Sequence, residues 1–567
     1  MTEPRPISES RREQIFPTLE PPEIDRLRRF GDICRYRADD LVVRAGKPSQ
    51  GVYVILSGEV LITPHEEDKR EHAIVTHGKG SFLGELAQLS GRPSLVDGKA
   101  LTDVEAILIP SLRLRDLLVE EAELGERIMR AMILRRVSLL EQRVGGPIIV
   151  GPADNRDVIR LEEFLGRNGH PHHHLDPGRD ESARQLVDRF HLKAVDLPIV
   201  LCLNGALLRN PGERQLAHCI GLSRAIDDAK TYNVAIVGAG PSGLAAAVYA
   251  ASEGLSVIVL DRHAFGGQAG ASARIENYLG FPTGISGMAL MGRAYAQAQK
   301  FGAELDIPDE VTGIADGTQL EDGTLALSLD GGGKIKTRSI VIASGARYRR
   351  LELPNLSEYE GSHVHYWASP FEARLCSGQE VAIVGAGNSA GQAAVYLAGS
   401  AKKVWLLARG KSLDVTMSRY LCERLAARPN LEVLLETELS GLRGRNGSLE
   451  EVCWRKRRTG EETCRPMQHV FMFIGADPHT SWLASAGVEL DPKGFVRADA
   501  VARGSRRLFE TNRPGIFAIG DVRAGSVKRV AAAVGEGAQV VAALHAFLAD
   551  SEGAHLGALQ AAESSHG

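Results

Sequence analysis

The sequence predicts a multidomain chain in which an N-terminal β-roll and a middle α/β domain precede two doubly wound α/β domains. Three observations lead to this prediction. At 567 residues, the chain has room for about three to four domains of about 150 residues each. Runs with a two-residue apolar period, separated by Gly turns, fill its first part. From residue 230 to 550, strands and helices alternate around Gly-rich turns, which is the pattern of doubly wound sheets.

Composition and charge are those of an ordinary globular protein. Apolar residues make up 44% and charged residues 24% of the sequence, which excludes disorder and coiled coil for most of its length. Lys and Arg number 67 against 71 Asp and Glu, a net charge of −4, so nothing electrostatic favours nucleic acid or an anionic lipid surface. The 61 glycines are an excess, and they indicate tight turns or backbone that closely approaches a ligand.

Cysteine usage and hydropathy predict a cytoplasmic location. The seven cysteines are scattered and odd in number, and no two have CxxC spacing, so no disulfide framework is expected. No apolar stretch approaches the roughly 18 residues of a membrane helix, and no charged-then-apolar leader opens the chain. We therefore expect a reduced protein without a membrane span.

The N-terminal part, residues 14–143, combines strands with a long helix. The segments DLVVRAGKPSQGVYVILSGEVLITP and AIVTHGKGSFLGELAQLSGRPSLV predict the strands of a small sandwich or barrel. Leu117, Leu124, Ile128 and Met132 follow helical spacing, and they predict one helix over residues 112–143 that ends before the glycines at 145–146.

The middle part, residues 146–225, alternates short strands with helices. PIIV and LPIVLCL predict strands, and RDVIRLEEFLGRNG and ESARQLVDRFHL predict helices. A closing helix is expected near residues 213–220. At the other end of the chain, the residues from Asp550 onward are small and polar, and a loose tail is expected there.

The most informative segment is NVAIVGAGPSGLAAAVYAASEGLSVIVLD. An apolar strand enters the turn of Gly238, Gly240 and Gly243, a helix of small residues follows, and a second strand ends at Asp261. Gly238 permits the tight turn, Gly240 has no Cβ to block a pyrophosphate, and Gly243 lets the helix pack closely. The helix N-terminus offers N–H donors to phosphates. Because Asp261 stands where a ribose hydroxyl is accepted, the segment predicts a dinucleotide cradle.

A second copy reads EVAIVGAGNSAGQAAVYLAGSAKKVWLLARG. Gly385, Gly387 and Ala390 take the three fingerprint positions, but the second strand ends at Arg409 rather than at an acid. A carboxylate at that place repels a 2′-phosphate, whereas Arg409, with Lys411 nearby, attracts one. The second cradle is therefore predicted to bind NADPH in preference to NADH.

Two cradles in one chain, the first ending in an acid and the second in a base, predict FAD in the first and a nicotinamide nucleotide in the second. Hydride would pass from the nicotinamide to the flavin, which releases two electrons singly or together.

Residues of about 230–548 resemble the low-molecular-weight thioredoxin reductases, in which a NADPH-binding segment is inserted between two FAD-binding segments. Beyond the fingerprints, the matching pieces are GGQ at 266–268, IENYLGFP at 275–282, ASGA at 343–346, FIGADP at 473–478 and GIFAIGDVR at 515–523. The resemblance implies an FAD-binding domain of residues 230–350 and 476–550, a NAD(P)H-binding domain of residues 351–475, and a homodimer.

The fingerprints and the resemblance together name the residues expected at each cofactor. Those expected at FAD are Gly238, Gly240, Ser242, Gly243, Asp261, Gly267, Gln268, Asn277, Ala343, Gly345, Gly520, Asp521, Lys528, Arg529 and Val530. Those expected at NADPH are Gly385, Gly387, Asn388, Ser389, Ala390, Arg409 and Lys411. In the family, the Gly520-Asp521 pair holds the ribityl and pyrophosphate region, and Asn277 lies near the flavin.

The resemblance ends at the redox chemistry. Thioredoxin reductases carry a CxxC just before the second fingerprint, where this chain reads WASP, at residues 367–370. Exchange with a protein disulfide by the family route needs an attacking and a resolving thiol. Cys376 is alone and is expected to act as a small buried hydrophobe. Glu372 is the carboxylate nearest the lost site. We therefore predict transfer of electrons from flavin to a different, unidentified acceptor.

Residues 146–225 resemble a thioredoxin- or glutaredoxin-like fold. DLPIV places Pro198 where a cis-proline opens the third strand. The CxxC position of that fold reads PADN, residues 152–155, so we expect a redox-silent spacer or docking module. Cys202 is expected to be a lone buried thiol.

Residues 14–143 resemble a cyclic-nucleotide-binding domain through YVILSGEV at 53–60 and FLGELAQLSGRPS at 82–94. The second of these segments matches the phosphate-binding cassette of that family. The residues expected in this cassette are Gly84, Glu85, Leu86, Arg92 and Ser94. Glu85 fits the acceptor of a ribose 2′-hydroxyl, and the short cassette helix would face an anion with its N-terminus. The family places an Arg after the Pro to pair with the cyclic phosphate, but Ser94 follows Pro93 here. A cyclic mononucleotide, another small regulatory ligand and a silent scaffold all stay open.

Two further clusters predict no function. HPHHHLDP, with His170, His172, His173 and His174, is expected to be a polar loop without a metal, because neighbouring residues of an extended segment point to opposite faces. RKRR, at residues 455–458, is expected on the solvated face of a hairpin.

The sequence therefore predicts an FAD-dependent NAD(P)H oxidoreductase of thioredoxin reductase-like fold that works without a CxxC and is gated by a ligand at its N-terminal domain. Two alternatives stay open. One is a flavin-containing redox or ligand sensor with little turnover, and the other is a thioredoxin-disulfide reductase.

Overall fold

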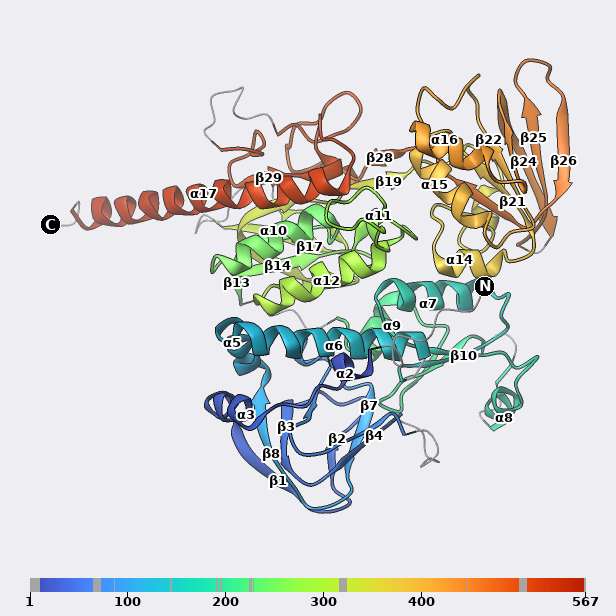
Figure 1. The fold of residues 1–567 in the computed structure, drawn as a ribbon. Helices are drawn as coiled ribbons and strands as arrows, with labels where there is room; N and C mark the ends of the chain where they lie inside the picture. The colour runs from blue at the N-terminus through green and yellow to red at the C-terminus, as the bar shows by residue number, and fades with distance from the viewer. Residues whose placement is uncertain are drawn as a thin grey trace.

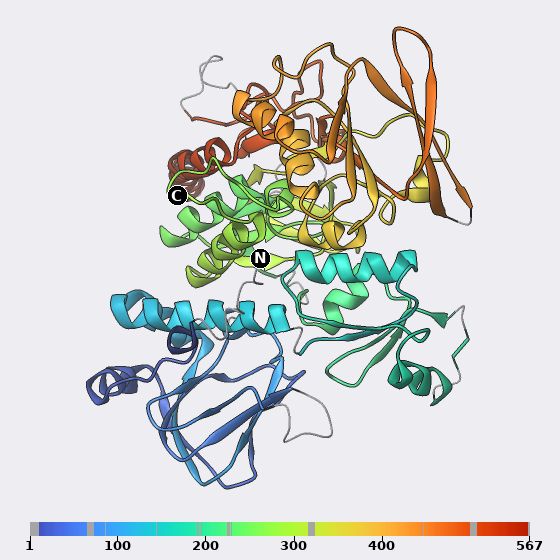
Figure 2. The same ribbon diagram turned by 45° about the vertical axis from the view of Figure 1, so that its right-hand side comes forward.

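The computed structural model describes residues 11–64, 73–85, 87–142, 145–189, 192–193, 196–223, 227, 229–315, 324–445, 447–498 and 507–564, with the backbone alone for residues 90, 189 and 552–564. Leu86, expected in the cassette, lies outside these residues. The N-terminal sheets and the teal middle domain lie side by side below the two α/β domains (Figure 1). The view turned by 45° shows the same arrangement (Figure 2).

The N-terminal part contains two antiparallel sheets of orders β1-β8-β3-β6 and β2-β7-β4-β5. Their strands are β1 (Asp32–Tyr36), β2 (Leu41–Val43), β3 (Gly51–Ser57), β4 (Val60–Pro64), β5 (Val75–His77), β6 (Phe82–Leu83), β7 (Val96–Ala100) and β8 (Val104–Pro110). The helices are α2 (Arg12–Ile15), α3 (Pro21–Leu27), η1 (Arg28–Phe30), α4 (Ala87–Ser90), α5 (Ser111–Glu120) and α6 (Ala122–Gln142). Val54, Phe82 and Ile107 are buried between the first sheet and the helices.

The single helix expected over residues 112–143 is wrong, because the chain turns between α5 and α6. Glu121 has φ −103° and ψ 79°, which is outside the helical range. Its carboxylate accepts hydrogen bonds from Arg26 and Arg29 of the preceding helices. These hydrogen bonds to distant residues stabilise the turn between the two helices, and helical periodicity cannot predict them.

The middle part has one four-stranded sheet of order β10-β9-β11-β12. The elements are β9 (Ile148–Val150), α7 (Arg156–Arg167), β10 (His173–Leu175), α8 (Glu181–Arg189), β11 (Ile199–Leu201), β12 (Leu207–Arg209) and α9 (Glu213–Cys219). β10 is parallel to β9, whereas β11 is antiparallel to both β9 and β12. The Leu197–Pro198 peptide bond is cis, as predicted.

Two disulfides correct the expectation of a fully reduced chain. Cys202 is bonded to Cys219 of α9, so it is not a lone thiol. Cys453 is bonded to Cys464, its direct partner in the register of two antiparallel strands. Neither pairing has CxxC spacing. The first disulfide depends on tertiary packing and the second on strand register, and cysteine spacing alone shows neither.

The first α/β domain contains a seven-stranded sheet of order β15-β14-β13-β18-β17-β16, with β29 beside β18. Its strands are β13 (Thr231–Val237), β14 (Val257–Leu260), β15 (Glu304–Asp306), β16 (Val311–Ile314), β17 (Leu325–Leu329), β18 (Lys334–Ile342) and β29 (Ile516–Ala518). Its helices are α10 (Pro241–Ser252), α11 (Gly267–Gly270), α12 (Gly287–Lys300), η5 (Ser481–Leu483), η7 (Gly520–Val522) and α17 (Val530–Ser564).

The second α/β domain has a five-stranded parallel sheet of order β20-β27-β21-β22-β23 and a three-stranded antiparallel sheet β24-β25-β26. Its strands are β20 (Val364–His365), β21 (Glu380–Val384), β22 (Lys403–Leu407), β23 (Leu431–Leu434), β24 (Thr437–Arg445), β25 (Ser448–Lys456), β26 (Glu462–Pro466) and β27 (His469–Met472). Its helices are α13 (Leu356–Tyr359), α14 (Pro370–Leu375), α15 (Asn388–Leu397) and α16 (Arg419–Ala426). The pair β19 (Ala346–Tyr348) and β28 (Ala476–Pro478) joins the two domains.

The last helix corrects two expectations. α17 continues through Ser564, so the residues after Asp550 are not a loose tail. Within the described residues, its segment Val530–Ser551 is the one helix long and apolar enough to cross a membrane by length and composition, with a mean hydropathy of 1.4 and 39% of the window buried. The expectation that no stretch approaches that length is therefore wrong. The segment is a core helix along part of its length, because Val540, Leu544 and Phe547 are buried in the core with α10.

Candidate functional site

The first fingerprint forms the turn between β13 and α10. Gly238 has φ +115°, and a Cβ there would lie 2.2 Å from the carbonyl oxygen of Ala343. A Cβ at Gly243 would lie 1.9 Å from the Gly238 carbonyl oxygen. Gly240 differs, since its Cβ would meet only the Cα of Gly267 at 4.0 Å. Two of the glycines therefore serve packing, and the third leaves space above the N-terminus of α10.

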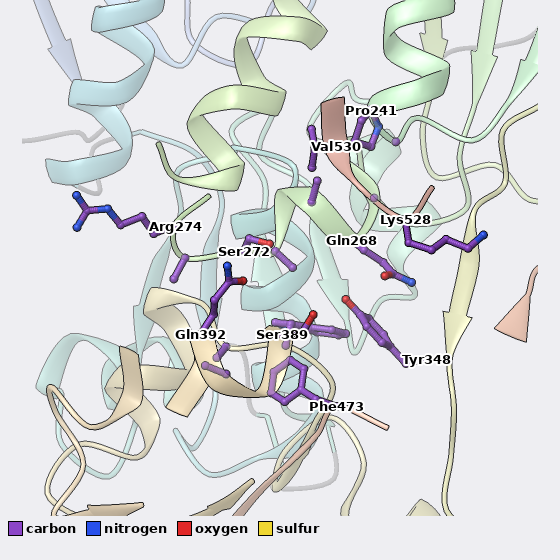
Figure 3. A pocket seen from close by; sticks show the side chains of 18 of the residues that line it. Pro241, Gln268, Ser272, Arg274, Tyr348, Ser389, Gln392, Phe473, Lys528 and Val530 are labelled. Carbon is purple, nitrogen blue, oxygen red and sulfur yellow. The ribbon is translucent and has the colours of Figure 1, made fainter. Parts of the chain in front are cut away.

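That space belongs to a cavity of about 690 Å³ between the two α/β domains (Figure 3). Of the residues expected at FAD, those that line it are Gly238, Gly240, Ser242, Asp261, Gly267, Gln268, Ala343, Gly345, Asp521, Lys528, Arg529 and Val530. Gly243, Asn277 and Gly520 are not on the lining, and Asn277 is exposed. The volume is within the range of roughly 300–1,000 Å³ of ligand pockets.

Backbone N–H groups hold Asp261 at the cavity wall. Its Oδ2 accepts a hydrogen bond from the N–H of Ala239 at 2.9 Å, and its Oδ1 accepts one from the N–H of His263 at 3.0 Å. The carboxylate at the end of β14 is thus fixed directly against the fingerprint turn. Oδ1 also accepts from the N–H of Ala264 at 3.3 Å. A carboxylate with two oxygens retains acceptor capacity beyond these three bonds.

The turn of Gly520 and Asp521 is anchored by α17. Glu536 accepts a hydrogen bond from the Gly520 N–H at 2.6 Å and forms an ion pair with Arg523 at 2.6 Å. Burial raises the pKa of the Asp521 carboxyl, while the nearby Lys528 ammonium lowers it. The Lys528 ammonium donates to the Asp521 carbonyl. Glu536, absent from the residues predicted from the sequence, therefore positions a segment of the cavity wall.

The helix of the second fingerprint, α15, lines the same cavity, but the fingerprint glycines Gly385 and Gly387 are not on the lining. Gly385 has φ +148°, and nothing lies within 4 Å of a Cβ built on Gly387. Ser389 and Gln392 of α15 line the cavity, and Figure 3 shows both among its lining side chains. The structure thus brings both fingerprint helices to one space.

The other residues expected at NADPH lie away from that space. Ala390 is buried against the strands, and the Asn388 side chain accepts a hydrogen bond from the Ser418 N–H at 2.7 Å. Arg409 and Lys411 are exposed just beyond β22. They lie where the sequence places them, at the far end of the second fingerprint unit.

The segment at 367–370 contributes an aromatic wall to the cavity in place of two thiols. Trp367 lines the cavity, with its ring centroid 6.3 Å from that of Tyr348. Its indole N–H donates to Glu372 at 3.0 Å, and the same carboxylate accepts from the Ser369 N–H at 2.7 Å. Glu372, 2% exposed, is therefore used as a cap of α14.

Cys376 has the environment of an unreactive thiol. Its side chain is 1% exposed, and its S–H donates to the Glu372 carbonyl at 2.6 Å. Burial, with the Glu372 charge beside it, raises the pKa of the Cys376 thiol to about 12. Because the thiolate is the nucleophile, the prediction of a small buried hydrophobe is confirmed.

The middle domain supplies a residue that no sequence motif indicates. Arg167 of α7 donates to the carbonyl of Gly267 at 3.2 Å, and its guanidinium lies 5.0 Å from the Trp367 ring. One side chain thus touches both α/β domains at the cavity wall. Its partners are 100 and 200 residues away in the sequence, so local patterns contain no sign of these contacts.

Glu163, one turn before Arg167, provides a prediction on pH. Burial raises the pKa of the Glu163 carboxyl to about 8 from 4.5. The native state then keeps a proton that the unfolded chain releases above about pH 4.5, so stability falls as the pH rises toward about 8. Glu163→Gln removes this dependence. We expect its apparent Tm to exceed that of the wild type by a few degrees, about 1–3 °C, at pH 9 and to match it near pH 4. A Tm difference that does not change with pH would contradict the assignment.

One residue of the cassette in the N-terminal part contacts the first α/β domain, and two others are buried. Gly84 has φ +149°, and Glu85 and Ser94 are 5% and 1% exposed. Arg92 donates to the hydroxyl of Tyr295 on α12, and its guanidinium lies 5.4 Å from the Tyr295 ring. The structure therefore directs Arg92 to the first α/β domain.

Two histidines of the cluster lie near a carboxylate, and the RKRR segment lies in a hairpin. His172 and His174 lie 3.7 and 3.9 Å from Glu162, and the RKRR segment is at the end of the β25–β26 hairpin. Within the described residues, the one group of three side chains close enough to hold a metal is Glu451, Cys453 and Cys464, and its two sulfurs are bonded to each other.

Comparisons with known proteins agree with this geometry. The thioredoxin reductase of Streptomyces coelicolor is 31% identical over 319 residues, which cover 56% of this chain and 94% of that protein. The NADPH-dependent thioredoxin reductase 3 of Arabidopsis thaliana is 35% identical over 320 residues, 55% of this chain and 57% of that protein. The crystal structure of Lactococcus lactis thioredoxin reductase matches with a TM-score of 0.51 at 29% identity, and the match covers 56% of this chain and 99% of that one.

Two family models match the chain. Residues 33–121 match the cyclic nucleotide-binding domain, and residues 232–537 match the pyridine nucleotide-disulphide oxidoreductases. Thioredoxin reductase-like members of the latter family use FAD and NADPH, and the open cradle at Gly240 and the cavity volume fit an FAD. The chain, with its N-terminal cyclic nucleotide-binding domain, therefore belongs to the pyridine nucleotide-disulphide oxidoreductase family, as an FAD-dependent NAD(P)H oxidoreductase of the thioredoxin reductase-like kind.

Proposed function

We propose that this protein passes electrons from NADPH through FAD to an acceptor that is not handled by a dithiol. One observation carries the proposal: both fingerprint helices open onto one cavity whose described lining contains no cysteine. When bound there, FAD accepts hydride from the nicotinamide and releases the electrons singly or together. What remains for the chain is to bind both nucleotides, orient them and admit the acceptor.

The first cradle would hold FAD through the lining residues predicted from the sequence. Gly240 and the N–H groups at the start of α10 would receive the pyrophosphate, and Asp261 would accept a ribose hydroxyl. Gln268 donates to the Ala346 carbonyl at 2.6 Å, which orients its amide along the wall. Asp521, on the turn held by α17, is the polar group expected at the ribityl chain.

The second cradle would hold NADPH, with Arg409 selecting the 2′-phosphate. Arg409→Ala is expected to raise the KM for NADPH about tenfold or more and to leave the KM for NADH unchanged, because NADH lacks the phosphate that the guanidinium pairs with. Steady-state kinetics with both coenzymes measure this. Arg419→Ala, which removes an exposed arginine of α16, is the matched control. Equal losses with NADPH and NADH would exclude this role for Arg409.

The direct test of the proposed function is anaerobic reduction of the purified protein. A flavin spectrum that NADPH bleaches in a stopped-flow experiment supports the proposal, and a screen of quinones, ferredoxin, dioxygen and small disulfides would identify the acceptor. A colourless protein, or a flavin that both NADPH and NADH leave oxidised, would refute it. Turnover below about 1 s⁻¹ with every acceptor would instead favour the sensor alternative.

Thioredoxin-disulfide reduction is the second candidate, because bacterial relatives with that name match over most of their length. The geometry of Cys376 argues against it. Cys376→Ser is expected to leave NADPH oxidation within about twofold of the wild type with any acceptor, since the thiol is buried and protonated. Assays with thioredoxin and with a quinone measure this. A selective loss of thioredoxin reduction would restore the dithiol-type mechanism.

The proposal also assigns a separate role to each domain. Residues 230–350 and 476–550 would bind FAD, residues 351–475 NAD(P)H, residues 14–143 a regulatory ligand, and residues 146–225 would act as a thioredoxin-like docking module. The contacts of Arg167 with Gly267 and Trp367 support the docking role. A homodimer in the cytoplasm stays a prediction.

A further inference from the structure

A second cavity, of about 70 Å³, lies in the N-terminal β-roll of residues 14–143. By the volume that one water needs, about 10–15 Å³, this space holds roughly five to seven water-sized groups. Ligand pockets for larger molecules measure roughly 300–1,000 Å³. A cyclic mononucleotide, with its base, ribose and phosphate, does not fit the cavity in this arrangement. Most of the described lining is apolar, from Val43, Ile62, Val75, Leu83, Val96 and Leu139.

The cassette itself offers no cation to this cavity among its described residues. Ser94 lines it, but its hydroxyl donates to the carbonyl of Val96 at 2.8 Å. Arg92 is directed away, to Tyr295. The two cassette residues nearest the position of the missing arginine therefore both have other partners.

Arg135 of α6 places a guanidinium at the cavity instead. It is 7% exposed and lines the cavity. Nε donates to the carbonyl of Ile15 at 2.9 Å, and Nη1 donates to the carbonyls of Phe82 and Gly84 at 3.0 and 2.7 Å. Nη2 is buried and has no hydrogen-bond partner in the described part of the chain. A buried charged donor without a hydrogen-bond partner costs free energy. The unpartnered Nη2 therefore indicates that a bound acceptor completes this site.

The charges around Arg135 do not balance. Glu85, 5% exposed, lies 3.6 Å from Arg136, and its two oxygens have no hydrogen-bond partner among the described residues. Burial, together with the Arg135 charge, lowers the pKa of His77 to about 3, so this imidazole is neutral. Burial lowers the pKa of Arg135 to about 9, which leaves it charged at neutral pH. The cluster of Arg135, Arg136 and Glu85 therefore holds two guanidiniums and one carboxylate, an excess of one positive charge. Arg135 and Glu85 are the members of this cluster that line the cavity.

We propose that the β-roll cavity is a binding site for a small monoanion with an apolar body, a carboxylate of about three to five carbons. Its carboxylate would accept hydrogen bonds from Nη2 of Arg135, and its short chain would lie among the apolar lining residues. A small carboxylate would balance the excess positive charge, accept from the free donor and fit the limited volume of this site. It differs in ligand class from the nucleotide that the domain family suggests.

Calorimetric titration of the full-length, FAD-loaded protein tests the proposal, with butyrate as the probe. Butyramide has the same shape without the charge, and cyclic AMP represents the nucleotide class. We expect saturable binding of butyrate, binding of butyramide that is about tenfold weaker or more, and no binding of cyclic AMP at the same concentrations. Butyramide binding as tight as butyrate, no butyrate binding, or cyclic AMP binding that butyrate does not compete with would overturn the proposal.

Two variants place the site in the β-roll. Arg135→Gln removes the charge, and Ser138→Phe fills the cavity from a half-buried position of α6 that also lines it. Butyrate binding is expected to fall at least tenfold in both, and to be unchanged in Ser182→Phe, which adds the same ring to an exposed position of α8. If Arg135→Gln does not fold, as judged by circular dichroism, Ser138→Phe decides alone. Undiminished binding in Ser138→Phe would refute the location. Flavin reduction by NADPH is a separate readout, so either proposal can fail without the other.

Discussion

Replacement of Gly240 by Leu is expected to abolish the retention of FAD while the protein still folds. The position tolerates a Cβ within the chain, because the nearest atom would be 4.0 Å away. A longer side chain would extend into the cavity above the N-terminus of α10, where the pyrophosphate is expected. We expect FAD affinity to fall about 100-fold or more, which corresponds to about 3 kcal/mol. Flavin absorbance after dialysis, together with circular dichroism, measures both parts of the prediction.

Two matched variants separate the cradle from the fold. Gly243→Ala would bring a Cβ to 1.9 Å from the Gly238 carbonyl oxygen, so it is expected to lower the stability of the domain itself. Gly387→Leu blocks the second cradle, which is equally open, and is expected to raise the KM for NADPH without loss of FAD. Full FAD retention in Gly240→Leu would show that the cofactor does not lie across this turn.

The second large effect is expected from Glu536→Ala. The carboxylate holds the Gly520 N–H and pairs with Arg523, and the side chains of the ion pair are 13% and 20% exposed. Removal of one partner of such a pair leaves a largely buried charge uncompensated, at a cost of about 3 kcal/mol. It also frees the turn that carries Asp521 to the cavity. We therefore expect a lower apparent Tm and a loss of FAD on dilution.

A graded control shows which contact matters. Glu536→Gln keeps an oxygen that can accept from the Gly520 N–H but loses the charge opposite Arg523, so an intermediate loss is expected. Glu423→Ala breaks an exposed pair with Arg419 and should change the Tm little. If Glu536→Ala retains FAD as well as Glu423→Ala does, then η7 is held by other contacts.

Trp367, in the wall of the cavity, contacts residues from two other parts of the chain. Trp367 lies between Tyr348 of one α/β domain and Arg167 of the middle domain. Arg424 of α16 also forms an ion pair with Glu276 across the cavity at 2.8 Å. These contacts join the second α/β domain to the first α/β domain and to the middle domain.

Much of the site can be predicted from the sequence because its chemistry is local. A strand, a glycine turn and a helix N-terminus are consecutive, so Gly238, Gly240 and Asp261 are predicted together, and they line one cavity. The absence of CxxC and the cis bond at Pro198 are also properties of a few adjacent residues. Arg409 is likewise predicted from its place at the end of one strand.

Only the tertiary structure decided the rest, because it depends on residues that are far apart in the chain. The sequence by itself determined two nucleotide cradles and the absence of a CxxC, since each is set by the backbone conformation and side chains of one short segment. Packing between domains decided that α10 and α15 line one cavity and that Arg167 contacts Trp367, whereas packing within the middle domain decided that Cys202 meets Cys219. The packing of the β-roll leaves Nη2 of Arg135 without a partner among the described residues. Periodicity and spacing describe neighbours along the chain, whereas burial and charge balance depend on neighbours in space.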